Sequence, residues 1–229
     1  MKILKNISYD VWCLIKLTIF FILDQIIAGL IVFKQIHKLT LGQLKIWQII
    51  FYLSALIIII FMLWRYYQQL KHNNYLKYRP HFPSIRDFGI IFIGLISIFA
   101  MEFVMGIVCQ TLHMPLASSS ANQQLVNHLS QDNPQAMFWF GVVFAPMMEE
   151  LIFRGFFFNY FFKKMHGFQT VFAIILDGCI FGYMHEQTHF LIWLVYTMLG
   201  CILAVCYYQS KNIYVSMSIH MLNNLIAFV

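Results

Sequence analysis

About seven long apolar stretches divide this chain of 229 residues. They run over residues 10–33, 47–64, 88–112, 137–162, 171–187, 189–208 and 213–229. The hydrocarbon core of a bilayer is about 30 Å thick, and an α-helix of about 20 apolar residues crosses it. The stretches lack the apolar–polar alternation of strands, so helices are the predicted spanning elements. The sequence therefore predicts an all-α fold, a polytopic transmembrane bundle of about seven helices.

The composition supports a membrane protein and argues against other classes. Hydrophobic types make up 61% of the residues and charged types only 10%, which leaves too little charged surface for a water-soluble fold. The formal net charge of +6 could suggest nucleic acid, but the basic residues lie in short loops between apolar stretches. We therefore expect the lipid bilayer as a partner and no nucleic acid.

The basic residues also predict an orientation. The loop 65–87 holds five Lys and Arg residues, whereas the loop 113–136 holds none. Cytoplasmic loops carry the excess of positive charge, so the first loop is expected inside, the second outside and the N-terminus inside. The loop 34–46 disagrees, because it should be external and carries three lysines.

The distribution of polar residues predicts two parts. Residues 1–134 are expected to form N-terminal transmembrane helices, in which polar residues are sparse. Residues 135–229 hold four of the apolar stretches, and because the polar residues within apolar stretches cluster there, this is the part in which chemistry is expected.

Five acidic residues lie inside apolar stretches. An ionised carboxylate in such a place costs at least about 2.5–3.5 kcal/mol, so each one needs a partner or a wet cavity. These residues are Asp24, Glu102, Glu149, Glu150 and Asp177. The densest group is the segment PMMEELIFRG, residues 146–155, and it is the first place to look for chemistry.

Within this segment the helical spacing separates two roles. Glu150 and Arg154 are four residues apart and can form an ion pair along one helix. Glu149 is turned about 100° away around the axis and is free to face elsewhere. Pro146 permits a kink that opens a polar cavity. A plain helix end is the alternative, but apolar residues continue well beyond Arg154.

Two later stretches supply basic and amide partners. The segment FGYMH ends its helix with His185, and HMLNN carries His220 and Asn224 four residues apart on one face. A single membrane histidine usually forms a packing hydrogen bond. Two histidines and an asparagine together with an unpaired glutamate favour a functional site.

The three motifs resemble those of the CPBP family, the CAAX-protease and bacteriocin-processing intramembrane endopeptidases. The family pattern is E-E-x-x-x-R, then F-x-x-x-H, then H-x-x-x-[ND], spread over the last four helices. In this chain the pattern falls on Glu149, Glu150 and Arg154, on Phe181 and His185, and on His220 and Asn224. The resemblance covers about residues 135–229, and three ordered motifs are far more specific than one.

The resemblance implies a catalytic mechanism. Glu149 would act as general base on a water molecule that His185 helps to position. His220 and Asn224 would bind the developing oxyanion of the scissile carbonyl. A glutamate in apolar surroundings is a more effective base, and donors four residues apart on a helix can converge on one oxygen.

Three further residues of the motifs are expected to give structural support rather than to take part in the chemistry. They are Glu150, Arg154 and Phe181. The Glu150–Arg154 pair would hold the helix so that Glu149 faces the cavity.

The function expected from the resemblance is that of an intramembrane endopeptidase. The implied substrates are peptides or proteins at the membrane, such as CAAX-type proteins or the precursors of bacteriocins and signal peptides. Self-immunity to a bacteriocin is a further possibility within the family. The expected location is the plasma membrane of a bacterium, as an integral multi-pass protein.

A competing motif overlaps the second one. Residues 185–189 read H-E-x-x-H, the zinc-protease signature, with His185 and His189 as ligands and Glu186 as base. That geometry needs one continuous helix, whereas the motif lies at the junction of two apolar stretches. We therefore expect Glu186 and His189 in a turn outside the membrane.

Metal dependence stays open on residue types alone. Glu149, His185 and His220 would form a set of two histidines and one carboxylate, which suits zinc as well as water activation. We favour a site without metal or other cofactor, because Asn224 makes a better partner for a carbonyl than a zinc ligand. The alternatives are a zinc-dependent intramembrane protease, a non-enzymatic membrane immunity or binding protein, and a transporter.

Counting residues tests whether the motifs can meet. From the expected cytoplasmic helix ends, at about 1.5 Å per residue, Glu149 and His185 both lie ~21 Å deep. His220 lies ~10 Å deep. The last helix must therefore begin deeper in the membrane or tilt.

Overall fold

The computed structural model describes residues 2–37, 39–113, 121–163 and 165–228, and among these it contains helices and no strand. The α-helices are α1 (Lys2–Ile36), α2 (Leu41–His72), α3 (Ile85–Thr111), α4 (Ala121–Asp132), α5 (Pro134–Phe138), α6 (Ala145–Glu150), α7 (Phe158–Phe161), α8 (Phe168–His185), α9 (Phe190–Ser210) and α10 (Ile213–Phe228). Two π-helical turns, η2 (Trp139–Phe144) and η3 (Leu151–Phe157), join α5, α6 and α7. The predicted all-α class is confirmed.

Six helical segments are long and apolar enough to cross a membrane, and α10 is a shorter apolar helix. They are Tyr9–Lys34, Leu41–His72, Ile85–Thr111, Pro134–Phe161, Phe168–His185 and Phe190–Ser210. With α10 they correspond to the seven predicted stretches. The chain is thus an integral multi-pass membrane protein. The predicted external loop 113–136 is different, because α4 and the start of α5 lie in it, while residues 114–120 lie outside the described part.

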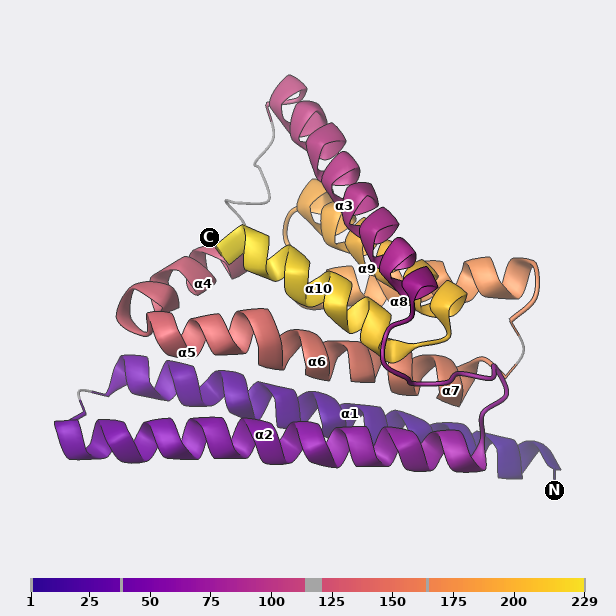
Figure 1. Cartoon of the computed structure of the whole chain (residues 1–229), viewed down its shortest axis with the longest axis horizontal. Coiled ribbons are helices and arrows are strands. Elements are labelled where there is room, and N and C mark those ends of the chain that lie inside the picture. Colours follow the sequence, from indigo (N-terminus) through magenta and orange to yellow (C-terminus); the bar gives the residue numbers. More distant parts are fainter. Residues whose placement is uncertain (1, 38, 114–120, 164, 229) are drawn as a thin grey trace.

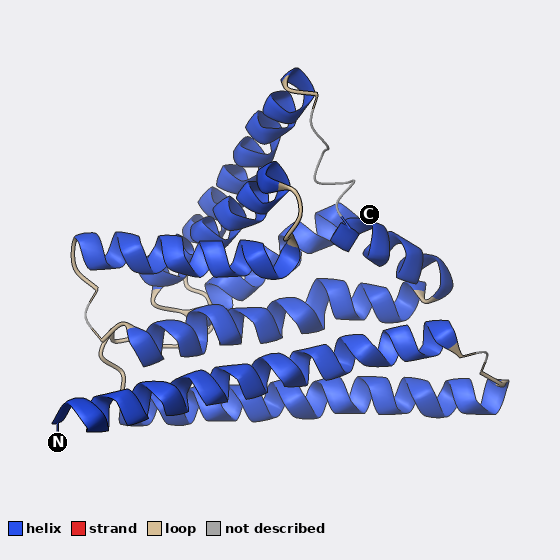
Figure 2. Ribbon diagram, turned by 180° about the vertical axis from the view of Figure 1, so that it is seen from behind, coloured by secondary structure: helices blue, strands red, loops and turns tan. Residues whose placement is uncertain are grey.

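The segment Pro134–Phe161 forms one continuous helix, here called the central helix. Figure 1 shows α1 and α2 side by side along one edge of the molecule, with the central helix next to them. Helix α10 lies between the central helix and the group formed by α3, α8 and α9, and Figure 2 gives the same order from behind. Helix α10 therefore packs against the central helix on one side and against α3 and α9 on the other.

Helix α1 packs along the central helix in the opposite direction. The ring of Phe20 stacks on that of Phe156, with centroids 4.2 Å apart and an interplanar angle of 11°. Lys16 lies four residues before Phe20 and Tyr160 four residues after Phe156, and Lys16 Nζ is 5.8 Å from the ring centroid of Tyr160. The two helices are therefore antiparallel, because residue numbers rise along α1 as they fall along the central helix. Continuing this register from Phe20 places the residues near Asp24 beside α6.

Helices α8 and α9 approach closely through glycines. A Cβ added at Gly178 would lie 2.6 Å from the carbonyl oxygen of Thr197, and one at Gly182 would lie 2.9 Å from the nitrogen of the same residue. Gly178 and Gly182 are four residues apart, the small-residue spacing that lets membrane helices touch. This contact fixes the end of α8, where His185 lies.

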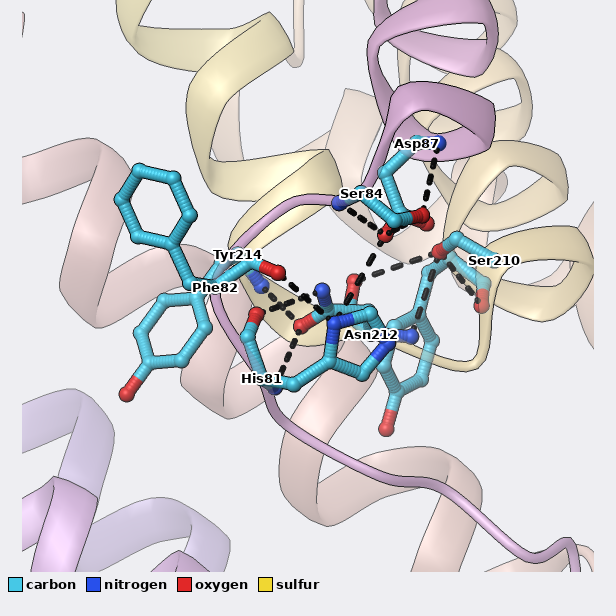
Figure 3. Close-up of polar contacts among 8 residues, drawn as sticks. His81, Phe82, Ser84, Asp87, Ser210, Asn212 and Tyr214 are labelled. Carbon is cyan, nitrogen blue, oxygen red and sulfur yellow. Dashed lines mark hydrogen bonds and ion pairs between the residues drawn. The ribbon is translucent and has the colours of Figure 1, made fainter.

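The connection between α2 and α3 is held against the turn between α9 and α10 (Figure 3). Asn212 Nδ2 donates to the carbonyl oxygen of His81 at 2.8 Å, and its Oδ1 accepts from the backbone nitrogen of Tyr214 at 3.2 Å. Ser84 and Asp87 form a capping box that begins α3. Asn212 thereby fixes the start of α10, the helix that carries His220.

The central helix leaves α-helical geometry on both sides of α6. In η2 the backbone nitrogen of Ala145 donates to the carbonyl of Phe140, five residues back, and the next residue, Pro146, has no N–H to donate. The carbonyl of Gly141 therefore loses its usual partner within the helix. Pro146 does disturb the helix, as predicted, but the disturbance is a π-helical turn, a feature frequent at functional sites.

Candidate active site

Glu149 faces two histidines from two other helices. It lies on α6, and its Oε2 is 3.8 Å from Nε2 of His185 on α8 and 3.8 Å from Nε2 of His220 on α10. The side chains of Glu149 and His185 are each 19% exposed, and that of His220 is 3% exposed. The structure thus brings together three of the residues predicted to form the site. The spacing is too long for direct hydrogen bonds, and both Nε2 atoms lie at the same distance from one carboxylate oxygen.

His185 is held by its own helix. Its Nδ1 lies 2.8 Å from the carbonyl oxygen of Phe181, and because a carbonyl only accepts, Nδ1 carries the proton. Neutral His185 therefore presents an unprotonated Nε2 to Glu149. The imidazole is stacked between the rings of Phe181, at 4.3 Å, and Tyr196, at 4.9 Å.

His220 is held by Glu150. Its Nδ1 lies 3.0 Å from Glu150 Oε1, and both side chains are buried. Because the carboxylate accepts this proton, the Nε2 atom is left to face Glu149. Glu150 was expected to support the helix only; the structure adds a direct contact with His220. Glu150 thus lies at Nδ1 of this imidazole and Glu149 near its Nε2.

Arg154 joins three helices from a fully buried position. Its Nη1 donates to Glu150 Oε1 at 3.0 Å along the central helix, which is the predicted pair. Its Nη2 donates to the carbonyl oxygen of Gly200 on α9 at 2.7 Å. Its Nε is 3.3 Å from Asp177 Oδ2 on α8. This arginine therefore neutralises two acids inside the apolar bundle and fixes Glu150, which in turn fixes His220.

The ring of Phe181 packs against both histidines and Arg154. Its ring stacks on that of His185, meets that of His220 at 5.8 Å and 67°, and lies 4.9 Å from the guanidinium carbon of Arg154. It is fully buried. The position predicted for structural support thus contacts both histidines and the arginine.

Asn224 has a partner within the protein that the sequence analysis did not predict. Its Nδ2 donates to the carbonyl oxygen of Gly141 at 2.8 Å. This is the carbonyl that the π-helical turn and Pro146 deprive of a helical donor. Asn224 therefore ties α10 to η2, and an amide nitrogen has a second N–H to offer.

Sequence reasoning overlooked Asp24 as a neighbour of this site. Asp24 is 5% exposed on α1, accepts from Gln25 Nε2 at 3.0 Å through Oδ2, and its Oδ1 has no hydrogen-bond partner among the described residues. Its carboxylate interacts electrostatically with Glu149. The sequence did show Asp24 as a single acidic residue in an apolar stretch, but it contained no motif that connects this residue with the segment of Glu149.

The H-E-x-x-H string does not form a helix. Helix α8 ends at His185, and α9 begins at Phe190. Glu186 folds into the turn between them, where its carboxylate accepts from the backbone nitrogens of Thr188, at 2.8 Å, and His189, at 3.1 Å. Burial raises the pKa of Glu186, but these hydrogen bonds outweigh it and lower the pKa to about 2. The expected turn is confirmed, and Glu186 stabilises it.

The donor atoms at Glu149 fit zinc in type. Two imidazole nitrogens and a carboxylate are a common zinc set, and each histidine is oriented by a partner on its Nδ1. Zinc–ligand bonds of about 2.0–2.1 Å place two ligands about 3.3 Å apart in a tetrahedral site, slightly closer than the 3.8 Å found here. Among the described residues no three such side chains are close enough to hold a metal ion as they stand.

Comparison with known proteins finds a match for the C-terminal part of the chain. The family model described as Type II CAAX prenyl endopeptidase Rce1-like matches residues 131–226. No solved structure matches the chain.

Three curated bacterial proteins are similar. The UPF0177 protein YvdC of Lactococcus lactis subsp. lactis (strain IL1403) is 31% identical over 65% of this chain and 53% of its own length. The membrane-embedded CAAX protease MroQ of Staphylococcus aureus (strain USA300) is 25% identical over 93% of this chain and 86% of its own. YdiL of Bacillus subtilis (strain 168), named as a candidate membrane peptidase, is 30% identical over 48% of this chain and 42% of its own length.

The matches cover about half the length of YvdC and less than half of YdiL, and most of MroQ. The matched family segment contains all seven residues of the three motifs, on the helices that meet at Glu149. Residues 131–226 are therefore similar to the Rce1-like CAAX protease family.

Proposed function

We propose that this protein is an intramembrane endopeptidase that hydrolyses a peptide bond with water activated by Glu149. The observation that carries the proposal is the position of one carboxylate oxygen 3.8 Å from the Nε2 atoms of both His185 and His220. A water molecule can bridge groups at such a separation. The similarity to membrane proteases supports the same reaction class.

In the first step Glu149 takes a proton from the water, and the water oxygen forms a bond to the scissile carbonyl carbon. Nε2 of His185 accepts a hydrogen bond from the same water and so orients it, because its Nδ1 proton is committed to Phe181. The apolar surroundings strengthen these interactions, since little bulk water competes.

In the second step the carbonyl oxygen, now negative, is stabilised by donors on α10. His220 can offer an N–H at Nε2 when it is protonated on both nitrogens, and the Glu150 carboxylate then balances its charge. The second amide N–H of Asn224 is the other donor. The C–N bond breaks as the proton on Glu149 passes to the leaving amine.

The proposed substrates are membrane-associated peptides or proteins. CAAX-type proteins and precursors of bacteriocins or signal peptides are the candidates, and cleavage that gives self-immunity to a bacteriocin is a related role. They follow from the family resemblance rather than from the shape of the site.

Two alternatives use the same residues. In a zinc-dependent protease, Glu149, His185 and His220 would hold the metal, which would supply Lewis-acid activation of the water. In a non-enzymatic immunity or binding protein the same polar cluster would only hold the helices together. The donor types favour the first as the stronger competitor.

The test is cleavage of candidate membrane peptides by the purified protein, with metal content measured in the same samples. We expect Glu149→Gln, His185→Ala and His220→Ala each to lower kcat by about 10²-fold or more, with native thermal stability for Glu149→Gln. Glu186→Gln should retain cleavage. Full activity of Glu149→Gln would refute the proposal, and stoichiometric zinc lost in the histidine variants would favour the metalloprotease.

A further inference from the structure

Helices α1 and α2 line a groove of about 230 Å³. Its lining is apolar except for one lysine and one arginine. The lining residues are Lys16, Ile19 and Phe20 from α1 and Phe61, Trp64 and Arg65 from α2. Exposed apolar side chains at its rim, such as Phe61 and Trp64, indicate that the groove opens toward lipid.

Neither cation in this groove has an acidic partner within 4 Å among the residues that the structure describes. None of the ion pairs among the described residues includes Lys16 or Arg65. Their contacts are with aromatic rings: Lys16 Nζ is 5.8 Å from the ring centroid of Tyr160, and Arg65 Cζ is 5.6 Å from that of Trp64. Two positive charges thus line one groove of a membrane-spanning surface, where a charge is costly without a counter-ion.

Both cations lie at the same depth. Helix α2 has 32 residues and is about 48 Å long, which exceeds a hydrocarbon core of about 30 Å by roughly 9 Å at each end. Arg65 lies about 10 Å from the end of α2 at His72, close to this boundary, and Lys16 lines the same groove. We therefore expect both charges near the lipid headgroup boundary of the same leaflet.

We propose that this groove binds an anionic phospholipid. The lipid phosphate would be held between the ammonium of Lys16 and the guanidinium of Arg65, and an acyl chain would lie along Phe61 and Ile19. Basic grooves between transmembrane helices commonly hold such headgroups, and guanidinium groups match phosphate oxygens in geometry. The five basic residues of the loop 65–87 predict that this leaflet is the cytoplasmic one.

The lipid would also act on the central helix. Phe20 lines the groove with one part of its surface and stacks on Phe156 of the central helix with its ring, at 4.2 Å. A lipid in the groove would therefore hold α1 against the helix that carries Glu149. Binding is accordingly expected to stabilise the folded protein, whether or not it is a protease.

The experiment measures binding to the full chain in a neutral detergent by thermal-shift titration with three separate ligands: phosphatidylglycerol, phosphatidylcholine and inorganic phosphate. Wild-type protein should be stabilised by phosphatidylglycerol at concentrations at which the other two have no effect. The double variant Lys16→Gln/Arg65→Gln should bind phosphatidylglycerol about tenfold or more weakly.

The matched control is Lys34→Gln/Lys45→Gln, which removes the same charge at the opposite end of α1 and α2 and should leave the affinity unchanged. Arg65→Gln alone should give a smaller loss and guards against a folding defect in the double variant. Equal stabilisation by phosphatidylcholine, equal loss in both double variants, or no loss in either would overturn the proposal. Stabilisation by inorganic phosphate alone would indicate a phosphate site and would overturn it too.

Discussion

Nδ1 of His220 lies 3.0 Å from Oε1 of Glu150, while Nε2 of the same ring lies 3.8 Å from Oε2 of Glu149. Of two adjacent glutamates, one thus lies beside Nδ1 of the imidazole and the other lies near Nε2. Glu150 is held by Arg154 and cannot turn away, whereas Glu149 is partly exposed. In the proposed mechanism the first glutamate of the motif reacts and the second positions His220.

The first prediction concerns Glu150→Gln. In the wild type both Arg154 Nη1 and His220 Nδ1 donate to Oε1 of Glu150. The amide oxygen of glutamine can still accept from them, but it carries no negative charge, so the imidazole is held more weakly and loses its counter-ion. We expect kcat to fall by about 10²-fold with little change in KM, because the residue lies away from the substrate. Steady-state kinetics on a cleavable peptide measure both. A rise in KM at unchanged kcat would contradict the positioning role.

The second prediction concerns Arg154→Met. This change leaves the buried carboxylate of Asp177 without a cation and that of Glu150 with only the His220 imidazole, and it removes the hydrogen bond to the Gly200 carbonyl. Breaking a buried ion pair in this way costs about 3–5 kcal/mol. Unfolding of the variant in nanodiscs should show that loss. The double variant Arg154→Met/Asp177→Leu should recover part of it, since one unpaired acid is gone, and no recovery would argue against the ion pair.

The third prediction concerns the contact between α8 and α9. In Gly178→Ala the new methyl group would lie 2.6 Å from the Thr197 carbonyl, so the helices must separate. We expect a loss of about 1–3 kcal/mol in the free energy of unfolding. Gly106→Ala on α3 is the control, because a Cβ there meets nothing within 4 Å. Equal stabilities of the two variants would show that the glycine contact is unimportant.

The fourth prediction concerns Asp24→Leu. The wild-type carboxyl group is buried, has one oxygen without a hydrogen-bond partner among the described residues, and interacts with another acid, Glu149. Burying such a group costs about 1–3 kcal/mol, so replacing it by leucine should raise the melting temperature. Thermal unfolding tests this, with Asp24→Asn as the isosteric control. A lower melting temperature for Asp24→Leu would mean that Asp24 has a stabilising partner.

Much of the architecture could be predicted because a bilayer restricts what an apolar sequence can do. The predicted stretches agree with the helices to within a few residues for α3, α8 and α9, and the acids inside apolar stretches drew attention to the helix that holds Glu149 and Glu150. The ion pair of Glu150 and Arg154 followed from spacing alone. The proposed chemical roles, and the division of the chain at residue 134, stay predictions.

Other features depend on tertiary contacts that no local pattern records. The π-helical turns depend on partners such as Asn224, which supplies the donor that the Gly141 carbonyl lacks. The depth count placed His220 too shallow, because it assumed straight, upright helices, whereas α10 is fixed through Asn212 and crosses between two groups of helices. The position of Asp24 beside α6 depends on the register between α1 and the central helix. Lipid and protein interiors are equally apolar, so hydrophobicity alone does not reveal such packing faces.

The last prediction concerns Glu186→Gln and the pH dependence of stability. The carboxylate of Glu186 has a pKa of about 2 in the folded protein, below its ordinary value of 4.5, because it accepts hydrogen bonds from Thr188 and His189. The unfolded chain therefore binds more protons between these two values, so the stabilisation is fully present above about pH 5 and is lost as the pH falls toward about 2. We expect the variant to be less stable than wild type by about 1 kcal/mol at pH 7, with the difference shrinking below about pH 5. Unfolding curves at several pH values measure it. Because Glu186 lies in the turn and not beside Glu149, peptide cleavage at pH 7 should persist, and a folded but inactive Glu186→Gln would restore the H-E-x-x-H interpretation.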